Sequence, residues 1–156
     1  MSNPRPEPKA DGLGTVPDHV LQQFRTQTQA DFEIDFFDSI LRDSPDYVDV
    51  LRCQGELLSR KGLHDRALDV DRRLAALAPA DPVVQYNLAC SLSRNGCCDE
   101  AIVVLAHALE SGYDDFEYLE LDGDLDLLRA DPRYRALLEQ YAPKPKRRAK
   151  RTRRKS

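Results

Sequence analysis

The sequence predicts an all-α fold in which helix–turn–helix units stack side by side. The main evidence is an echo with a period of 34 residues, which is typical of repeats that bury their apolar faces against their neighbours. Three cap-and-proline pairs, Ser44-Pro45, Asp81-Pro82 and Asp131-Pro132, mark helix starts. No stretch alternates with a period of two for long enough to predict a strand. The echo pairs Gly55 with Ala89, Leu58 with Leu92, Gly62 with Gly96, Asp65 with Asp99, Ala67 with Ala101, and Leu68 with Ile102.

The first 45 residues predict a leader followed by an incomplete unit. Residues 1–18 are rich in proline and glycine and lack the apolar segment of a secretory signal, so we expect a disordered leader. Residues 19–45 predict a degenerate repeat that begins with a short helix near residues 20–24. Its second helix should end at Ser44-Pro45, since apolar residues follow helical spacing there: Phe32, Phe36, Phe37, Ile40 and Leu41.

Residues 46–112 predict two complete units. Ser44 and Pro45 are expected to cap the first helix, which stops at Gly62, and a partner helix runs from about His64 to Pro79. The second unit repeats this plan. Its first helix starts at Asp81-Pro82 and stops at Gly96, and its second helix is closed by Gly112.

Residues 113–142 predict capping helices, the last of which starts at Asp131-Pro132. The echo fails after Gly112, because Gly123 and Asp126 fall where Ala89 and Leu92 would repeat. Alternating acids in residues 122–126 resemble a calcium loop, but leucine stands at position 127, where an EF-hand loop needs glycine. Helix capping explains these acids better.

Residues 30–141 resemble the tetratricopeptide repeat family, whose 34-residue pattern is W-x2-L-G-x2-Y, then A-x3-F, then P. The matching positions are Leu51, Gln54, Gly55, Leu58, Ala67, Asp71 and Pro79, then Gln85, Leu88, Ala89, Leu92, Ala101, Leu105 and Tyr113. Gln54, Gln85 and Asp71 are polar where the pattern is apolar, and Tyr113 replaces the closing proline. Residues 86–90 and 124–134 together resemble the terminal repeat and cap of many bacterial members. The resemblance implies a short α-α superhelix of about two and a half repeats plus C-terminal capping helices.

Asp71 is the most unusual departure from that pattern. We expect the helix to rotate its side chain outward, with Val70 and Leu74 facing the core. The alternative is a buried acid, which would need a polar partner.

The resemblance also implies where a partner binds. In that family the first helix of each unit lines a concave face that holds peptides or helices. By register, this face takes Asp49, Arg52, Cys53, Glu56 and Arg60 from one unit and Val83, Tyr86, Asn87, Cys90 and Arg94 from the next. Two equivalent arginines, Arg60 and Arg94, with Arg52 and Asn87 nearby, could hold a carboxylate or an acidic peptide, although the lysine–asparagine set of carboxylate-clamping members is not reproduced. Otherwise these charges are solvated or paired within the chain.

Charge is divided unevenly along the chain. Residues 1–143 carry 14 basic and 27 acidic side chains, whereas residues 144–156 carry nine basic and no acidic ones, and the total is −4. We expect residues 143–156 to form a disordered basic tail. Its basic residues are Lys144, Lys146, Arg147, Arg148, Lys150, Arg151, Arg153, Arg154 and Lys155. Three roles stay open: non-specific binding of polyanions such as nucleic acid, a solubilising tail that associates with the acidic body, and nuclear import.

Composition argues against several functional classes. No apolar run approaches the roughly 20 residues that cross a bilayer, so no membrane role is expected. Four cysteines and three histidines lack metal-site spacing, which predicts no metal or cofactor and free thiols in a reducing cytoplasm. The sequence contains no nucleophile motif and no phosphate-binding loop, so it does not predict an enzyme. The predicted function is a cytoplasmic, non-catalytic scaffold that binds a peptide or helix of a partner protein. The alternatives are a nucleic-acid adaptor anchored by the tail and a homodimer formed through Phe32, Phe36 and Phe37.

Overall fold

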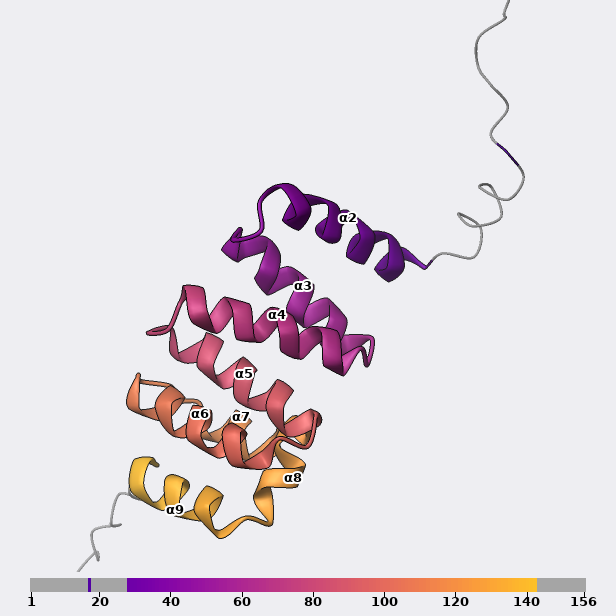
Figure 1. Ribbon diagram of the computed structural model, residues 1–156. Coiled ribbons are helices and arrows are strands. Elements are labelled where there is room, and N and C mark those ends of the chain that lie inside the picture. The colour runs from indigo at the N-terminus through magenta and orange to yellow at the C-terminus, as the bar shows by residue number, and fades with distance from the viewer. Residues whose placement is uncertain (1–16, 18–27, 143–156) are drawn as a thin grey trace, which may run out of the picture.

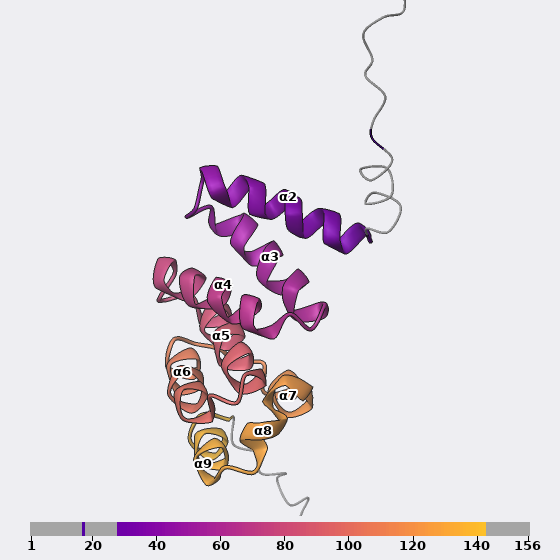
Figure 2. The same ribbon diagram turned by 45° about the vertical axis from the view of Figure 1, so that its right-hand side comes forward.

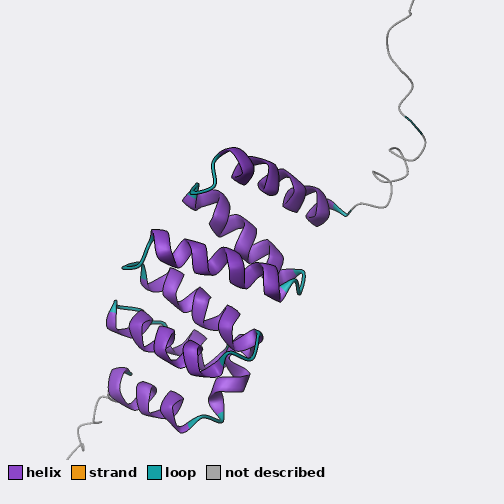
Figure 3. Cartoon of the chain, in the orientation of Figure 1, coloured by secondary structure: helices purple, strands orange, loops and turns teal. Residues whose placement is uncertain are grey.

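The computed structural model describes residue 17 and residues 28–142, and this part of the chain is helical without any strand (Figure 3). The all-α prediction is therefore confirmed. The elements are α2 (Gln29–Asp43), α3 (Val48–Arg60), α4 (His64–Leu77), α5 (Pro82–Arg94), α6 (Cys98–Glu110), α7 (Phe116–Leu121), η1 (Gly123–Leu125), α8 (Asp126–Arg129) and α9 (Pro132–Tyr141). The expected leader, the helix near residues 20–24 and the basic tail lie outside the described residues. None of the described helices is long and apolar enough to span a bilayer.

The helices stack in chain order from α2 at one end to α9 at the other (Figures 1 and 2). Helices α3, α5 and α7 begin at residues 48, 82 and 116, and α4, α6 and α9 begin at 64, 98 and 132. Both series keep an interval of 34 residues. The helix starts therefore continue the repeat into the third unit, α7 to α9, although the residue types stop echoing at Gly112. Helix α2 lies before α3 in the stack and packs against it, in the position of the second helix of a preceding unit.

Glycines end the helices where the sequence predicts them to. Gly62 and Gly96 have φ angles of 74° and 75°, which lie in the left-handed region that favours glycine. At the first turn the N–H of Gly62 donates to the carbonyl of Ser59 (2.9 Å), and the N–H of Leu63 donates to that of Leu58 (3.0 Å). This pair of bonds is a Schellman motif, and it recurs at Gly96 and Gly112.

Two of the three predicted cap-and-proline starts are confirmed. Asp81 Oδ1 accepts the N–H groups of Val83 (3.0 Å) and Val84 (3.1 Å), and Asp131 caps α9 in the same way. The start at Ser44-Pro45 is wrong. Ser44 ends α2, because its N–H donates to the carbonyl of Ile40 (2.8 Å), and α3 begins only at Val48.

Two apolar clusters form the core of the described residues. The large cluster spans α3 to α9 and contains eighteen buried residues, whereas the small cluster contains Ile34, Leu57, Leu58 and Ala67. Ala67 and Ala101 are 1% and 0% exposed. The close packing predicted at these small residues is therefore confirmed.

Asp71 corrects the sequence analysis, because its side chain is buried rather than rotated outward. It is 7% exposed, and its Oδ2 accepts a hydrogen bond from the hydroxyl of Ser91 on α5. Gly55 on α3 makes room for it, since a Cβ at that position would lie 2.8 Å from Asp71 Oδ1. Asp71 is thus the buried acid with a polar partner that the alternative interpretation required.

Candidate functional site

A groove crosses α3, α5 and α7 and consists of two connected hollows, with volumes of about 310 and 360 Å³. The first hollow is lined by Gly55, Glu56, Ser59, Arg60, Asp71, Tyr86, Asn87, Cys90, Ser91, Tyr118, Asp122 and Asp124. The second is lined by Pro82, Val83, Tyr86, Asn87, Gly112, Tyr113, Asp114, Asp115 and Tyr118. Tyr86, Asn87 and Tyr118 belong to both. We call this surface the groove.

Helical spacing explains why α3 and α5 present residues to the groove. Glu56 and Arg60 are four residues apart on α3, so they share one face. Asn87 and Cys90 are three residues apart on α5 and share the equivalent face of the next unit. Six of the ten residues predicted for the concave face line the groove: Glu56, Arg60, Val83, Tyr86, Asn87 and Cys90.

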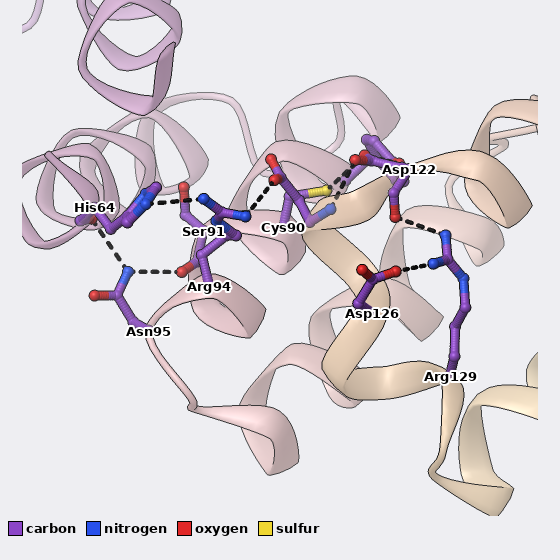
Figure 4. Close-up of polar contacts among 10 residues, drawn as sticks. His64, Cys90, Ser91, Arg94, Asn95, Asp122, Asp126 and Arg129 are labelled. Carbon is purple, nitrogen blue, oxygen red and sulfur yellow. Dashed lines mark hydrogen bonds and ion pairs between the residues drawn. The ribbon is translucent and has the colours of Figure 1, made fainter. Parts of the chain in front are cut away.

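The other four, Asp49, Arg52, Cys53 and Arg94, lie outside the lining. Arg52 Nη2 is 2.7 Å from Asp81 Oδ2, and this contact lowers the pKa of Asp81, the residue that caps α5. Arg94 contacts His64 Nε2 (3.0 Å) and Asp124 Oδ1 (3.4 Å), so it connects α4 with the segment after α7 (Figure 4). Both arginines are paired within the chain.

Asp122 holds two of the predicted residues to the floor of the groove. The hydroxyl of Tyr86 donates to Asp122 Oδ2 (2.6 Å). The thiol of Cys90 lies 3.5 Å from the same oxygen, and Figure 4 shows this contact. Burial is the main cause that raises the pKa of both the tyrosine and the thiol. The Cys90 thiol therefore stays protonated at neutral pH and is a poor nucleophile.

The lining of the groove is predominantly acidic. The first hollow combines Glu56, Asp71, Asp122 and Asp124 with a single basic residue, Arg60. Burial raises the pKa of Asp71, and burial together with the charge of Asp122 raises that of Asp124. Both shifts have the direction that burial and a neighbouring like charge produce, so a further negative charge is disfavoured in this hollow. This acidic lining argues against the carboxylate clamp that the sequence analysis considered.

An aromatic cluster joins the two hollows. The rings of Tyr86 and Tyr113 are stacked with centroids 4.2 Å apart, and burial raises the pKa of Tyr113 to about 12. Tyr118 is tilted against Tyr86, with centroids 6.1 Å apart, and is 53% exposed. Tyr118 therefore offers an open aromatic surface between groups of acids.

Several groove residues were missed in the sequence analysis, chiefly Asp71, Tyr118, Asp122 and Asp124. A signal was present in the position of Asp115, which caps α7 one full repeat after Asp81 caps α5. Tyr118 and Asp122 follow three and seven residues later and continue one helical face. Among the residues that the structure describes, no group of three His, Cys, Asp or Glu side chains could hold a metal ion.

Helix α2 carries the three phenylalanines through which the alternative homodimer would form. Phe32 and Phe36 are 56% and 52% exposed, whereas Phe37 packs against the small cluster. The nine basic residues predicted to bind polyanions all lie outside the described residues.

Comparison with known proteins gives a partial similarity. The chain is 31% identical over 91 residues to a chloroplastic protein of Arabidopsis thaliana. This match covers 56% of the present chain and 27% of the Arabidopsis protein, so the chain spans about a quarter of that relative's length. No family model matches the chain.

Proposed function

We propose that this protein is a small, non-catalytic scaffold of the tetratricopeptide-repeat type that binds an extended peptide or a helix of a partner protein in the groove. The observation that supports this proposal is the groove itself, which is open along three helices that start 34 residues apart. Such a surface lets one ligand contact several successive units.

The exposed groove residues suit a peptide ligand. Val83 is 49% exposed and offers an apolar contact, and the exposed amide of Asn87 can both donate to and accept from a peptide backbone. Tyr118 adds an aromatic surface to these contacts. With few units the groove is short, so we expect modest affinity unless a second contact contributes.

The proposed location is a reducing compartment such as the cytoplasm. All four cysteines, Cys53, Cys90, Cys97 and Cys98, are free thiols, and Cys53 is exposed. Free exposed thiols are typical of proteins that work under reducing conditions.

A peptide-library selection on the full-length chain tests the proposed function. Peptides that are enriched should bind the wild type and lose at least tenfold in affinity when Val83→Asp places a charge in the groove. Val103→Asp is the matched control, because Val103 on α6 is 68% exposed and does not line the groove. Equal losses in the two variants, or a selection that enriches nothing, would contradict the proposal.

A further inference from the structure

The groove carries more negative charge than its own cations balance. Its acids are Glu56, Asp71, Asp114, Asp115, Asp122 and Asp124, and Arg60 is the single basic residue in the lining. Arg60 is itself engaged, since its Nη1 lies 3.6 Å from Glu56 Oε1. Arg94 reaches the edge of the groove but is shared between Asp124 and His64. A bound cation would compensate the remaining charge.

One of these acids presents an unpaired oxygen to the first hollow. The side chain of Asp71 is more than nine-tenths buried and uses Oδ2 for the Ser91 hydroxyl. Its Oδ1 lies beside Gly55 and has no hydrogen-bond donor among the described residues. A carboxylate oxygen that lines this hollow without a protein donor can accept N–H groups from a ligand, such as those of lysine and arginine side chains.

Tyr118 adds a second feature that favours a cation. Its half-exposed ring stands between Asp115 and Asp122, and the charge of Asp122 is the main cause that raises the pKa of its hydroxyl. The faces of aromatic rings attract ammonium and guanidinium groups, especially in a negative environment. The groove therefore combines acids with an aromatic platform, a combination suited to lysine and arginine side chains.

We propose that the groove binds the chain's own basic segment, residues 144–156, within the same molecule. This inference rests on the proposed function, because it names the ligand class of the same groove. The segment has nine lysine and arginine residues and no acid, which complements the six acids of the groove. Its cationic side chains approach Asp71 Oδ1, Asp124 and the ring of Tyr118. A partner peptide must then compete with a tethered ligand, so the basic segment is autoinhibitory.

The length of the connecting chain permits this arrangement. Helix α9 ends at Tyr141, and the 14 residues from 143 to 156 can extend over roughly 45 Å. Helix α9 contacts α6, and α6, α5, α4 and α3 contact one another in turn. Packed helices lie about 8–10 Å apart, so these four spacings between α9 and α3 span roughly 32–40 Å. Helix α9 also belongs to the same unit as Tyr118 and Asp122.

The test uses the full-length chain and a labelled synthetic peptide of residues 143–156. In one variant, serine replaces all nine lysine and arginine residues of the segment; we call this the neutral-segment variant. It should bind the peptide at least tenfold more tightly than the wild type, whose own segment occupies the groove. Equal affinities for the two proteins would overturn intramolecular occupancy. The inference would also be overturned if the neutral-segment variant bound the peptide more tightly only at high protein concentration. That result would show that the segment of a second copy occupies the groove, because such occupancy depends on concentration.

Groove specificity is tested in the neutral-segment variant. Asp71→Asn combined with Asp124→Asn should weaken peptide binding at least fivefold, and Asp124→Asn alone covers the case in which the double variant does not fold. The control combines Asp65→Asn with Glu139→Gln, two exposed acids outside the groove, and should change affinity less than twofold. If the groove variant and the control variant lose the same amount of peptide affinity, the peptide is attracted to net charge alone, and the inference is overturned. If library peptides bind the groove while the 143–156 peptide does not, the inference fails and the scaffold function stands.

Discussion

The two ends of the helical stack differ in how their last apolar face is covered. At the C-terminal end, α7, η1, α8 and α9 contribute Leu119, Leu125, Leu128 and Tyr134, which all join the large cluster. At the N-terminal end, Ile34 is the one residue of α2 that is fully buried. The C-terminal end is therefore closed by a dedicated cap, whereas the residues that the structure describes provide no such cap beside α2.

A polar layer lies between the small cluster of the N-terminal end and the large one, and Val70 packs against both clusters. Gln54 is 3% exposed and donates to Asp38, and Asp71 bonds to Ser91. In stacked repeats, stability is roughly the sum of each unit and its interfaces, so a weak interface opens before the rest. We expect α2 and part of α3 to open locally while the units from α5 onward remain folded.

The largest expected effect comes from the closed end. Leu128→Ala removes a side chain that is 0% exposed, and it should lower the free energy of unfolding by about 3 kcal/mol, because the packed cap cannot collapse around the cavity. Chemical denaturation followed by circular dichroism measures this. Leu127→Ala is the control, since Leu127 is 57% exposed, and should cost less than about 0.5 kcal/mol. Equal losses would show that α8 does not close the core.

A smaller and more local effect is expected at the open end. Ile34→Ala should cost about 2 kcal/mol, at the low end for a buried isoleucine, because Ile34 is the one buried residue of α2 and belongs to the small cluster. Hydrogen exchange should show faster opening of the α2 amides, while amides of α5 and α6 keep their protection. If α5 and α6 lose protection equally, the two ends unfold as one unit and the comparison fails.

The sequence predicted those parts of the fold that depend on local chemistry. Gly62 and Gly96 end helices because of their own backbone conformation, and Asp81 caps a helix through bonds to residues two and three positions away. Asp71 could not be placed in this way, since its burial depends on Gly55 and Ser91, which lie 16 and 20 residues away. Similarly, the repeat register predicted six of the residues that line the groove. It could not predict how arginines would pair between units.

The layer between the clusters offers a test of intermediate size. In an ordinary helix, Gly55→Ala would add up to about 1 kcal/mol of stability through helix propensity. Here the new Cβ would lie 2.8 Å from Asp71 Oδ1, so we expect a net loss of about 1 kcal/mol. The same substitution should become stabilising in an Asp71→Ala background, which a double-mutant cycle measures. An additive cycle would show that Gly55 is not needed for the buried acid.

The smallest effect is expected from charge removal in that layer, and its sign depends on pH. Burial raises the pKa of Asp71 above its ordinary value of 3.8. A raised carboxyl pKa means that the folded state binds the proton more tightly, so the contribution of Asp71 to stability is complete below pH 3.8 and is lost as the pH rises through the folded pKa. The side chain introduced by Asp71→Asn does not ionise, so this loss of stability does not occur. Its amide oxygen can still accept the hydrogen bond from the Ser91 hydroxyl. The variant should therefore be slightly more stable than the wild type at about pH 7, with the gain disappearing toward about pH 3.5.

Thermal unfolding across this pH range measures the difference in stability, with Asp69→Asn as the exposed control on the same helix. A variant that loses stability at neutral pH would show that the charge of Asp71 holds the two clusters together, and the layer would then strengthen the N-terminal end.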